Sequence, residues 1–173
     1  MAWFIPGWGR DLAPGGRLER ALVAEASSLA EELVAEAFSL TPRECLSLQY
    51  ELLTDYALLP CRLPDSALAG LVRAETQALH PRKRRDFYFL FLAEERLLAL
   101  SQGDSLRALL LYIFTHELIH MVRFARFIAA FWMPMEVRWQ EERKVHRLAT
   151  QILQKVPWRE LGEILSRYDK IYA

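Results

Sequence analysis

The sequence of 173 residues is poor in cysteine, glycine and proline, and its formal charges cancel. The two cysteines, Cys45 and Cys61, exclude a disulfide framework and a cysteine-rich zinc knuckle, and we expect both to be small buried side chains in a reducing compartment. Seven glycines, eight prolines and 53% hydrophobic residues argue against a largely disordered chain. Zero net charge predicts no nucleic-acid partner. The one dense basic run, residues 82–85, is interpreted as a solvated loop.

The sequence also lacks a basic leader and a clean membrane-spanning segment. We therefore predict a cytoplasmic protein without a membrane span. The most apolar segment, residues 106–133, is long enough to cross a bilayer, but Glu117 and Arg123 interrupt it at a high cost in hydrocarbon. Near the N-terminus, Trp3 and Trp8 could dock on the body of the protein or on a protein partner.

The order of the predicted elements indicates an irregular N-terminal arm, residues 1–17, followed by a single domain, residues 18–173. Thr41 and Glu44 form a capping-box pattern around a proline, which predicts the start of a helix. Asp104 or Ser105 is expected to cap the long helix that ends at or before Pro134. Further helices are predicted over 18–38, 41–56, 65–78, 135–155 and 158–168, and strands over 87–92 and 96–100.

One motif carries the strongest chemical signal, because residues 116–120 read His-Glu-Leu-Ile-His and match H-E-x-x-H. Two histidines four positions apart lie on one face of a helix, so both imidazoles can reach a single Zn²⁺ at about 2.0–2.1 Å. Glu117, beside the first histidine, can take a proton from the attacking water. His116 and His120 are predicted to face the core together with four neighbours: Tyr112, Ile113, Ile119 and Phe127.

A hydrolytic zinc site needs a third protein ligand, and acidic and histidine residues follow at 141–146. Glu142 and His146 are four apart and share a helix face that can pack inward. The candidate third ligands are Glu142, then His146, then Glu141; otherwise these residues form exposed charge pairs with nearby arginines and Lys144. A donor to the transition state is also expected, and spacing favours none of the three candidates: Arg123, Tyr168 and Tyr172.

This arrangement resembles a gluzincin-type zincin metallopeptidase of the thermolysin-like class. Such enzymes carry H-E-x-x-H on one helix and a glutamate ligand on the next, often as E-x-x-x-D. The resemblance implies zinc at His116, His120 and Glu142, with His146 standing where an aspartate would orient a ligand histidine. It covers residues 87–153 and implies a minimal zincin core: an α+β, mainly helical fold with a small sheet packed on the motif helix.

The resemblance implies a zinc-dependent metallopeptidase that hydrolyses peptide bonds in a peptide or protein, with Glu117 as general base. It also implies that the strand at 87–92 pairs its edge with an extended substrate, although its unbroken apolar run favours burial on both faces. The alternative function is a non-catalytic zincin-like module that binds a protein partner through aromatic side chains: Trp3, Trp8, Phe131, Trp132 and Trp139.

Overall fold

The computed structural model of the chain describes residues 2–6, 17–54, 63–74 and 87–173. Among these residues, helices predominate over a single small sheet of mixed strand direction. This composition confirms the predicted α+β, mainly helical class. Where the sequence predicts an arm and one domain, the chain divides into two compact units. We call residues 1–17 with 41–100 the sheet unit, and residues 18–40 with 101–173 the helical unit.

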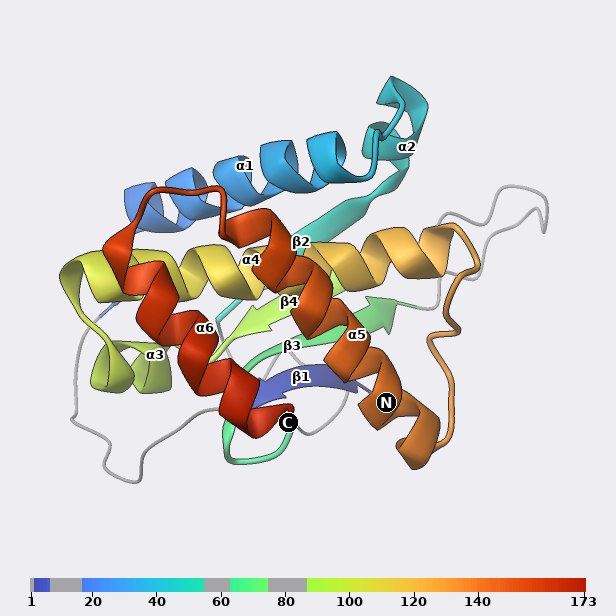
Figure 1. Cartoon of the computed structure of the whole chain (residues 1–173). Helices are drawn as coiled ribbons and strands as arrows, with labels where there is room; N and C mark the ends of the chain where they lie inside the picture. The colour runs from blue at the N-terminus through green and yellow to red at the C-terminus, as the bar shows by residue number, and fades with distance from the viewer. Residues whose placement is uncertain (1, 7–16, 55–62, 75–86) are drawn as a thin grey trace. The chain divides into compact units, whose positions relative to one another are not determined.

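The described part of the sheet unit contains four strands in the order β1-β3-β4-β2 (Figure 1). β1 (Ala2–Pro6) pairs antiparallel with β3 (Ala67–Ala74), which pairs antiparallel with β4 (Phe87–Leu92). β4 in turn pairs in parallel with β2 (Gln49–Leu53). Apolar side chains from the strands and their connections form a buried cluster: Leu63, Ala67, Val72, Phe91 and Ala93.

The prediction of an irregular arm is wrong for its first residues, because they form β1. Trp3 and Ile5 are fully buried there, and the burial of two large apolar side chains stabilises the strand. Gly70 permits the close approach of β3, since a Cβ atom at this position would lie 2.9 Å from the carbonyl oxygen of Trp3. Trp3 is therefore a core residue of the sheet unit; Trp8 lies outside the described residues.

Among the described residues, two predicted helices of the sheet unit contain strands. The capping box is confirmed, since the Thr41 hydroxyl accepts a hydrogen bond from the backbone N–H of Glu44. The helix it starts, α2 (Pro42–Ser47), is nevertheless short, and the predicted extension to residue 56 is wrong because β2 follows. The helix predicted at 65–78 is wrong over residues 67–74, because β3 bonds a neighbour on each side and this pairing outweighs the helix propensity of its alanines and leucines. Residues 75–78 lie outside the described residues.

One of the two cysteines, Cys45, lies in the short helix α2 and is not the buried side chain that was expected. None of the residues of α2 is buried, and Cys45 is exposed. Cys61 and the basic run at 82–85 lie outside the described residues. The predictions that depend on those two segments stay predictions.

The strand predicted at 96–100 is wrong, because these residues belong to the helix α3 (Glu94–Leu100). Two glutamates in its first turn favour the helix N-terminus electrostatically. Arg96 donates a hydrogen bond to the Ala67 carbonyl oxygen at 2.8 Å, so the helix is held to the start of β3.

The strand predicted at 87–92 is confirmed as β4, but its implied role in pairing with substrate is wrong. β4 lies inside the sheet, with β3 bonded to one side and β2 to the other along its length. A strand paired on both sides has no free backbone edge to offer an extended peptide.

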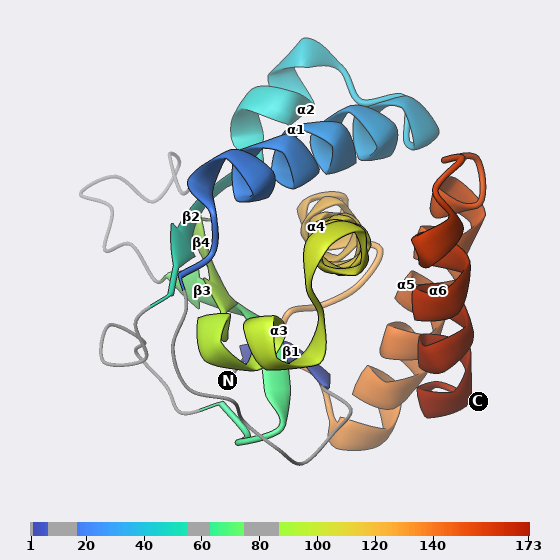
Figure 2. The ribbon, with the colours of Figure 1, turned by 90° about the vertical axis from the view of Figure 1, so that its left-hand side faces the viewer.

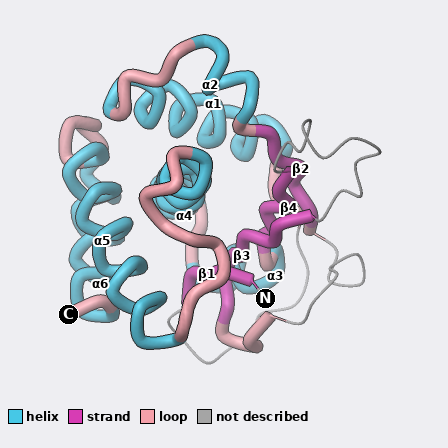
Figure 3. Tube along the Cα trace, turned by 90° about the vertical axis from the view of Figure 1, so that its right-hand side faces the viewer, coloured by secondary structure: helices cyan, strands magenta, loops and turns pink. Residues whose placement is uncertain are grey.

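The helical unit consists of α1 (Arg20–Ala37), α4 (Gly103–Ala125), α5 (Met135–Leu153) and α6 (Arg159–Ile171). α4 packs against each of the other three helices. Seen along its axis, α4 lies with α1 on one side and with α5 and α6 on another (Figures 2 and 3). The predicted helices at 18–38, 135–155 and 158–168 are confirmed, with ends that differ by a few residues.

α4 carries the H-E-x-x-H motif and is buried along most of its length. It is long and apolar enough to cross a membrane, yet 89% of its most apolar 18-residue stretch is buried inside the fold. Such burial is typical of a core helix. The absence of a membrane span stays a prediction.

Both ends of α4 differ from the prediction. The helix begins at Gly103, which has a φ of +55°, and no side chain caps it, so the predicted caps at Asp104 and Ser105 are wrong. It ends at Ala125, well before Pro134, and Phe127 beyond it adopts a left-handed φ of +55°. The Phe127 side chain is 94% exposed, so its predicted place on the inward face with the histidines is wrong.

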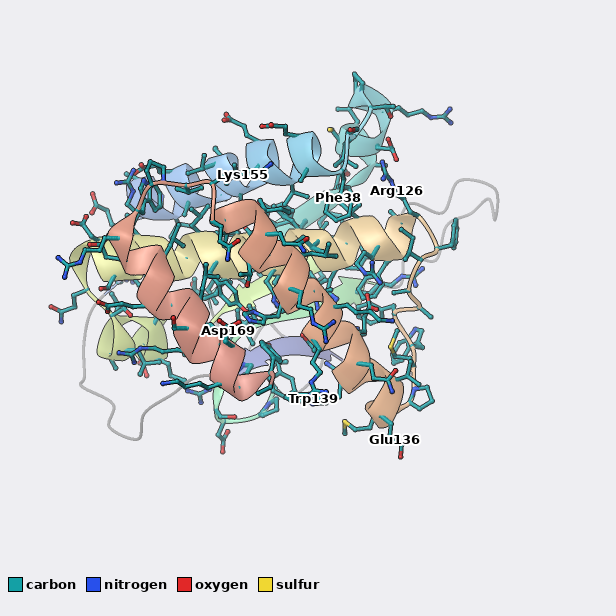
Figure 4. All side chains as sticks on the ribbon, in the orientation of Figure 1. Phe38, Arg126, Glu136, Trp139, Lys155 and Asp169 are labelled. Carbon is teal, nitrogen blue, oxygen red and sulfur yellow. The ribbon has the colours of Figure 1, made fainter. Side chains whose placement is uncertain are left out.

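Polar contacts fix α4 to its neighbours in the helical unit. Arg126 donates a hydrogen bond to the carbonyl oxygen of Phe38 at 3.1 Å, close to the end of α1 (Figure 4). Near the other end, Arg107 forms an ion pair with Glu25 and lies 4.0 Å above the ring of Trp158. These contacts hold the motif helix at both ends.

Candidate metal centre

Three side chains from α4 and α5 converge inside the helical unit. The Nε2 atoms of His116 and His120 lie 3.0 Å and 3.3 Å from the Glu142 Oε2 atom. The three residues are at most 5% exposed, and their potential ligand atoms lie within 4.8 Å of one another. Within the described ranges they form the one cluster of at least three metal-binding side chains. The fold therefore brings together the two histidines of the motif and Glu142, the first-ranked candidate for the third ligand.

The protonation states of these groups suit a cation. Burial lowers the pKa of His116 to about 4, so its imidazole is neutral at pH 7. Burial raises the pKa of Glu142, but electrostatic attraction to His120 and close polar contacts with both histidines outweigh it and lower this pKa to about 2. Neutral imidazole and ionised carboxylate are the forms that bind metal ions.

The geometry and chemistry of the cluster fit zinc. Ligand atoms around a tetrahedral zinc at about 2.0–2.1 Å are roughly 3.4 Å apart, close to the 3.0 Å and 3.3 Å found here. Two imidazole nitrogens and one carboxylate oxygen are a donor set typical of zinc, whereas calcium and magnesium prefer oxygen alone. The cluster can therefore hold a metal ion, and zinc matches its donors.

Glu117 lies in the same buried region without a hydrogen-bond partner. Its side chain is 1% exposed, and neither carboxylate oxygen is hydrogen-bonded within the described part of the chain. Burial raises the pKa of Glu117 well above its ordinary value, repulsion by Glu142 adds to this, and the charge of Arg138 opposes it. An unsatisfied buried carboxyl group is costly, and its presence beside metal-binding side chains points to a chemical role.

The other two candidate ligands have different partners. Glu141 forms an ion pair with Arg123, whose Nη2 atom donates to Oε2 at 2.9 Å. This pairing accounts for the burial of Glu141 and occupies Arg123, one of the candidate transition-state donors. His146 contacts the hydroxyl group of Tyr112 at 3.0 Å and Asp169 at 2.8 Å, and so lies behind His116 rather than beside Glu142.

Three tyrosine rings border the histidines. Tyr168 stacks on Tyr112 with ring centroids 4.2 Å apart, and Tyr172 stacks on His116 at 6.0 Å. The Tyr172 hydroxyl is buried and has no hydrogen-bond partner among the described residues. Burial raises the pKa of Tyr172 well above its ordinary value, which keeps this hydroxyl a donor at neutral pH. Of the three candidate donors, Tyr172 is the one whose polar atom is left available.

Arg138 is a neighbour of the site that sequence reasoning missed. It is half-buried on α5, and its positive charge interacts with Glu142 and Glu117. The signal available in the sequence is its spacing, because residues four apart share a helix face and Arg138 is four before Glu142. Because Arg138 was interpreted as part of an exposed charge pattern, its electrostatic interaction with the two glutamates was not predicted.

No protein-family model, curated protein or solved structure matches the chain. The function must therefore be argued from the geometry of this buried cluster.

Proposed function

We propose that the protein is a zinc-dependent metallopeptidase. The observation that supports this most strongly is the convergence of His116, His120 and Glu142 around one position, with an unpartnered Glu117 close by. His116, His120 and Glu142 would hold the ion. A bound Zn²⁺ would polarise the scissile carbonyl group and lower the pKa of a nearby water molecule.

Glu117 supplies the proton transfers of this reaction. Its carboxylate accepts a proton from water as the water oxygen attacks the carbonyl carbon. It then gives the proton to the departing amine nitrogen as the C–N bond breaks. Its raised pKa brings a glutamate closer to the neutral range in which a general base works best.

Tyr172 and Arg138 complete the proposed site. The free hydroxyl group of Tyr172 is suited to donate a hydrogen bond to the oxygen that becomes negative in the tetrahedral state. Arg138, whose charge acts on both glutamates, is suited to bind a carbonyl or carboxylate oxygen of the substrate.

A peptide-library digest of the zinc-loaded protein tests the proposal. We expect cleavage by the wild type, loss of cleavage with a chelator, and recovery on adding zinc. Glu117→Gln should bind zinc but lose activity by about 10²–10⁴-fold, because an amide cannot accept the proton. Wild-type rates in this variant would remove Glu117 from the mechanism.

One feature favours a second candidate, a zincin-like module that binds a protein partner. Large apolar side chains are exposed on the connection to α5 and on its first turn: Phe127 (94%), Ile128 (55%), Trp132 (54%) and Met135 (80%). Of the aromatic side chains expected from the sequence at such a surface, Trp132 and Trp139 (44%) are exposed, whereas Phe131 is buried at 4%. Zinc binding without cleavage of any library peptide, together with loss of a partner on Trp132→Ser, would favour this candidate.

A further inference from the structure

A chain of polar contacts leads from His116 to the protein surface. The Nδ1 atom of His116 lies 3.4 Å from the Tyr112 hydroxyl, which lies 3.0 Å from Nδ1 of His146. The Nε2 atom of His146 lies 2.8 Å from a carboxylate oxygen of Asp169. Tyr112 and His146 are buried, whereas the Asp169 side chain is 62% exposed (Figure 4). The contacts thus pass from α4 to α5 and then to α6.

With Asp169 ionised and both imidazoles neutral, one set of donors and acceptors makes each of these contacts a hydrogen bond. An ionised carboxylate only accepts, so the Nε2–H group of His146 donates to Asp169. The Nδ1 atom of a neutral His146 then accepts, and its donor is the Tyr112 hydroxyl. The tyrosine oxygen has used its single proton and can only accept, here from Nδ1–H of His116.

The consequence appears at the other nitrogen of His116. With its proton on Nδ1, the neutral imidazole presents an Nε2 lone pair toward Glu142 Oε2, 3.0 Å away. A lone pair and a carboxylate oxygen at this distance repel each other unless a cation lies between them. The tautomer that satisfies the contacts behind His116 is therefore also the tautomer that binds metal.

The middle of the chain is held in place by ring packing. The Tyr112 ring stacks on Tyr168 with centroids 4.2 Å apart, and Tyr168 is fully buried. Tyr168 precedes Asp169 on α6, so one helix both packs the tyrosine ring and supplies the final carboxylate. The hydroxyl group of Tyr112 accordingly has little freedom to leave either histidine.

We propose that Asp169 is a positioning residue that sets the tautomer of His116 through His146 and Tyr112. The inference rests on the proposed zinc site. Groups that orient a ligand histidine typically change metal affinity by about 10–100-fold. An ordinary exposed ion pair between His146 and Asp169 would contribute little and would leave His116 unchanged.

Zinc affinity and ring tautomers in Asp169 variants test this proposal. The chain has four histidines, so long-range ¹H–¹⁵N spectra of the metal-free protein resolve the protonated nitrogen of each ring. Asp169→Ala should weaken zinc binding about tenfold and mix the tautomers of His116. Asp169→Asn keeps an acceptor oxygen and should have a smaller effect. Glu163→Ala, which removes an exposed carboxylate from the same helix, should have none.

A double-mutant cycle tests the route through Tyr112. Tyr112→Phe removes only the hydroxyl group and should weaken zinc binding by about 10–100-fold. Adding Asp169→Ala should cause no further loss, because the connection is already broken. Additive losses, or an Asp169→Ala protein with wild-type zinc affinity and an unchanged His116 tautomer, would overturn the proposal. A wild type that binds no zinc would refute the proposed function, whereas the metal-free spectra still judge the effect of Asp169 on His116.

Discussion

Two regions of the helical unit depart from ordinary residue burial in opposite directions. Around His116, His120 and Glu142, ionisable side chains are buried. Between α4 and α5, large apolar side chains such as Phe127 and Trp132 are exposed. Buried ionisable side chains that converge on one position can hold a metal ion, and exposed apolar side chains indicate a surface available for contact. The contrast predicts large mutational effects in the first region and small ones in the second.

The largest effect is expected on zinc content. His120→Ala removes a proposed neutral ligand, and Glu142→Ala removes the proposed charged ligand. Each should lower zinc affinity by more than about 100-fold, beyond the loss typical of a group behind a ligand. Glu141→Ala is the matched control, since the neighbouring carboxylate is paired with Arg123. Elemental analysis and chelator competition measure the difference. Retention of zinc by Glu142→Ala with loss in His146→Ala would make the site a three-histidine one.

A smaller effect is expected on the stability of the metal-free protein. Because the folded-state pKa of Glu117 is raised, folding loses stability as the pH rises above the ordinary glutamate pKa. Glu117→Gln removes this penalty, so its gain over the wild type should grow by up to about 1.4 kcal/mol per pH unit above that pKa. Denaturant unfolding at pH 5 and pH 7 measures it, and Glu163→Gln serves as an exposed control. An equal gain in unfolding free energy at pH 5 and pH 7 would argue against a raised pKa of Glu117 in the folded protein.

The smallest effect is expected in the exposed region. Phe127 has a left-handed φ of +55° at 94% exposure, so it carries backbone strain without compensating burial. Phe127→Gly should therefore stabilise the protein by about 0.5–1 kcal/mol, whereas Phe127→Ala should not, because alanine is strained in the same way. Thermal unfolding of the two variants separates them. Equal stability would show that the backbone at this position is not strained.

The site could be predicted further than the fold. Helical periodicity fixes the relation of His116 to His120, and of Glu142 to His146, from sequence alone. Contacts that join helices, such as those of Tyr112 with His146 and of Asp169 with His146, depend on packing that no local pattern encodes. They were missed for that reason.

The errors in the fold have the same cause. β2 and β3 are rich in residues that also favour helices, and they are strands because neighbours distant in sequence supply their hydrogen bonds. The end of α4 at Ala125 was missed because neither glycine nor proline marks it. The left-handed residue that ends the helix is a phenylalanine, a residue type that seldom adopts this conformation.

The division of the chain has a consequence for how the protein folds. α1 packs against α4, yet about 65 residues separate the two helices, and closing a loop of this length costs roughly 4 kcal/mol in chain entropy. α4, α5 and α6 follow one another with short connections, so their contacts close at a lower cost. α1 is therefore expected to join last, after the residues that converge on Glu142 have already met. The candidate metal position can form during folding before its helical unit is complete.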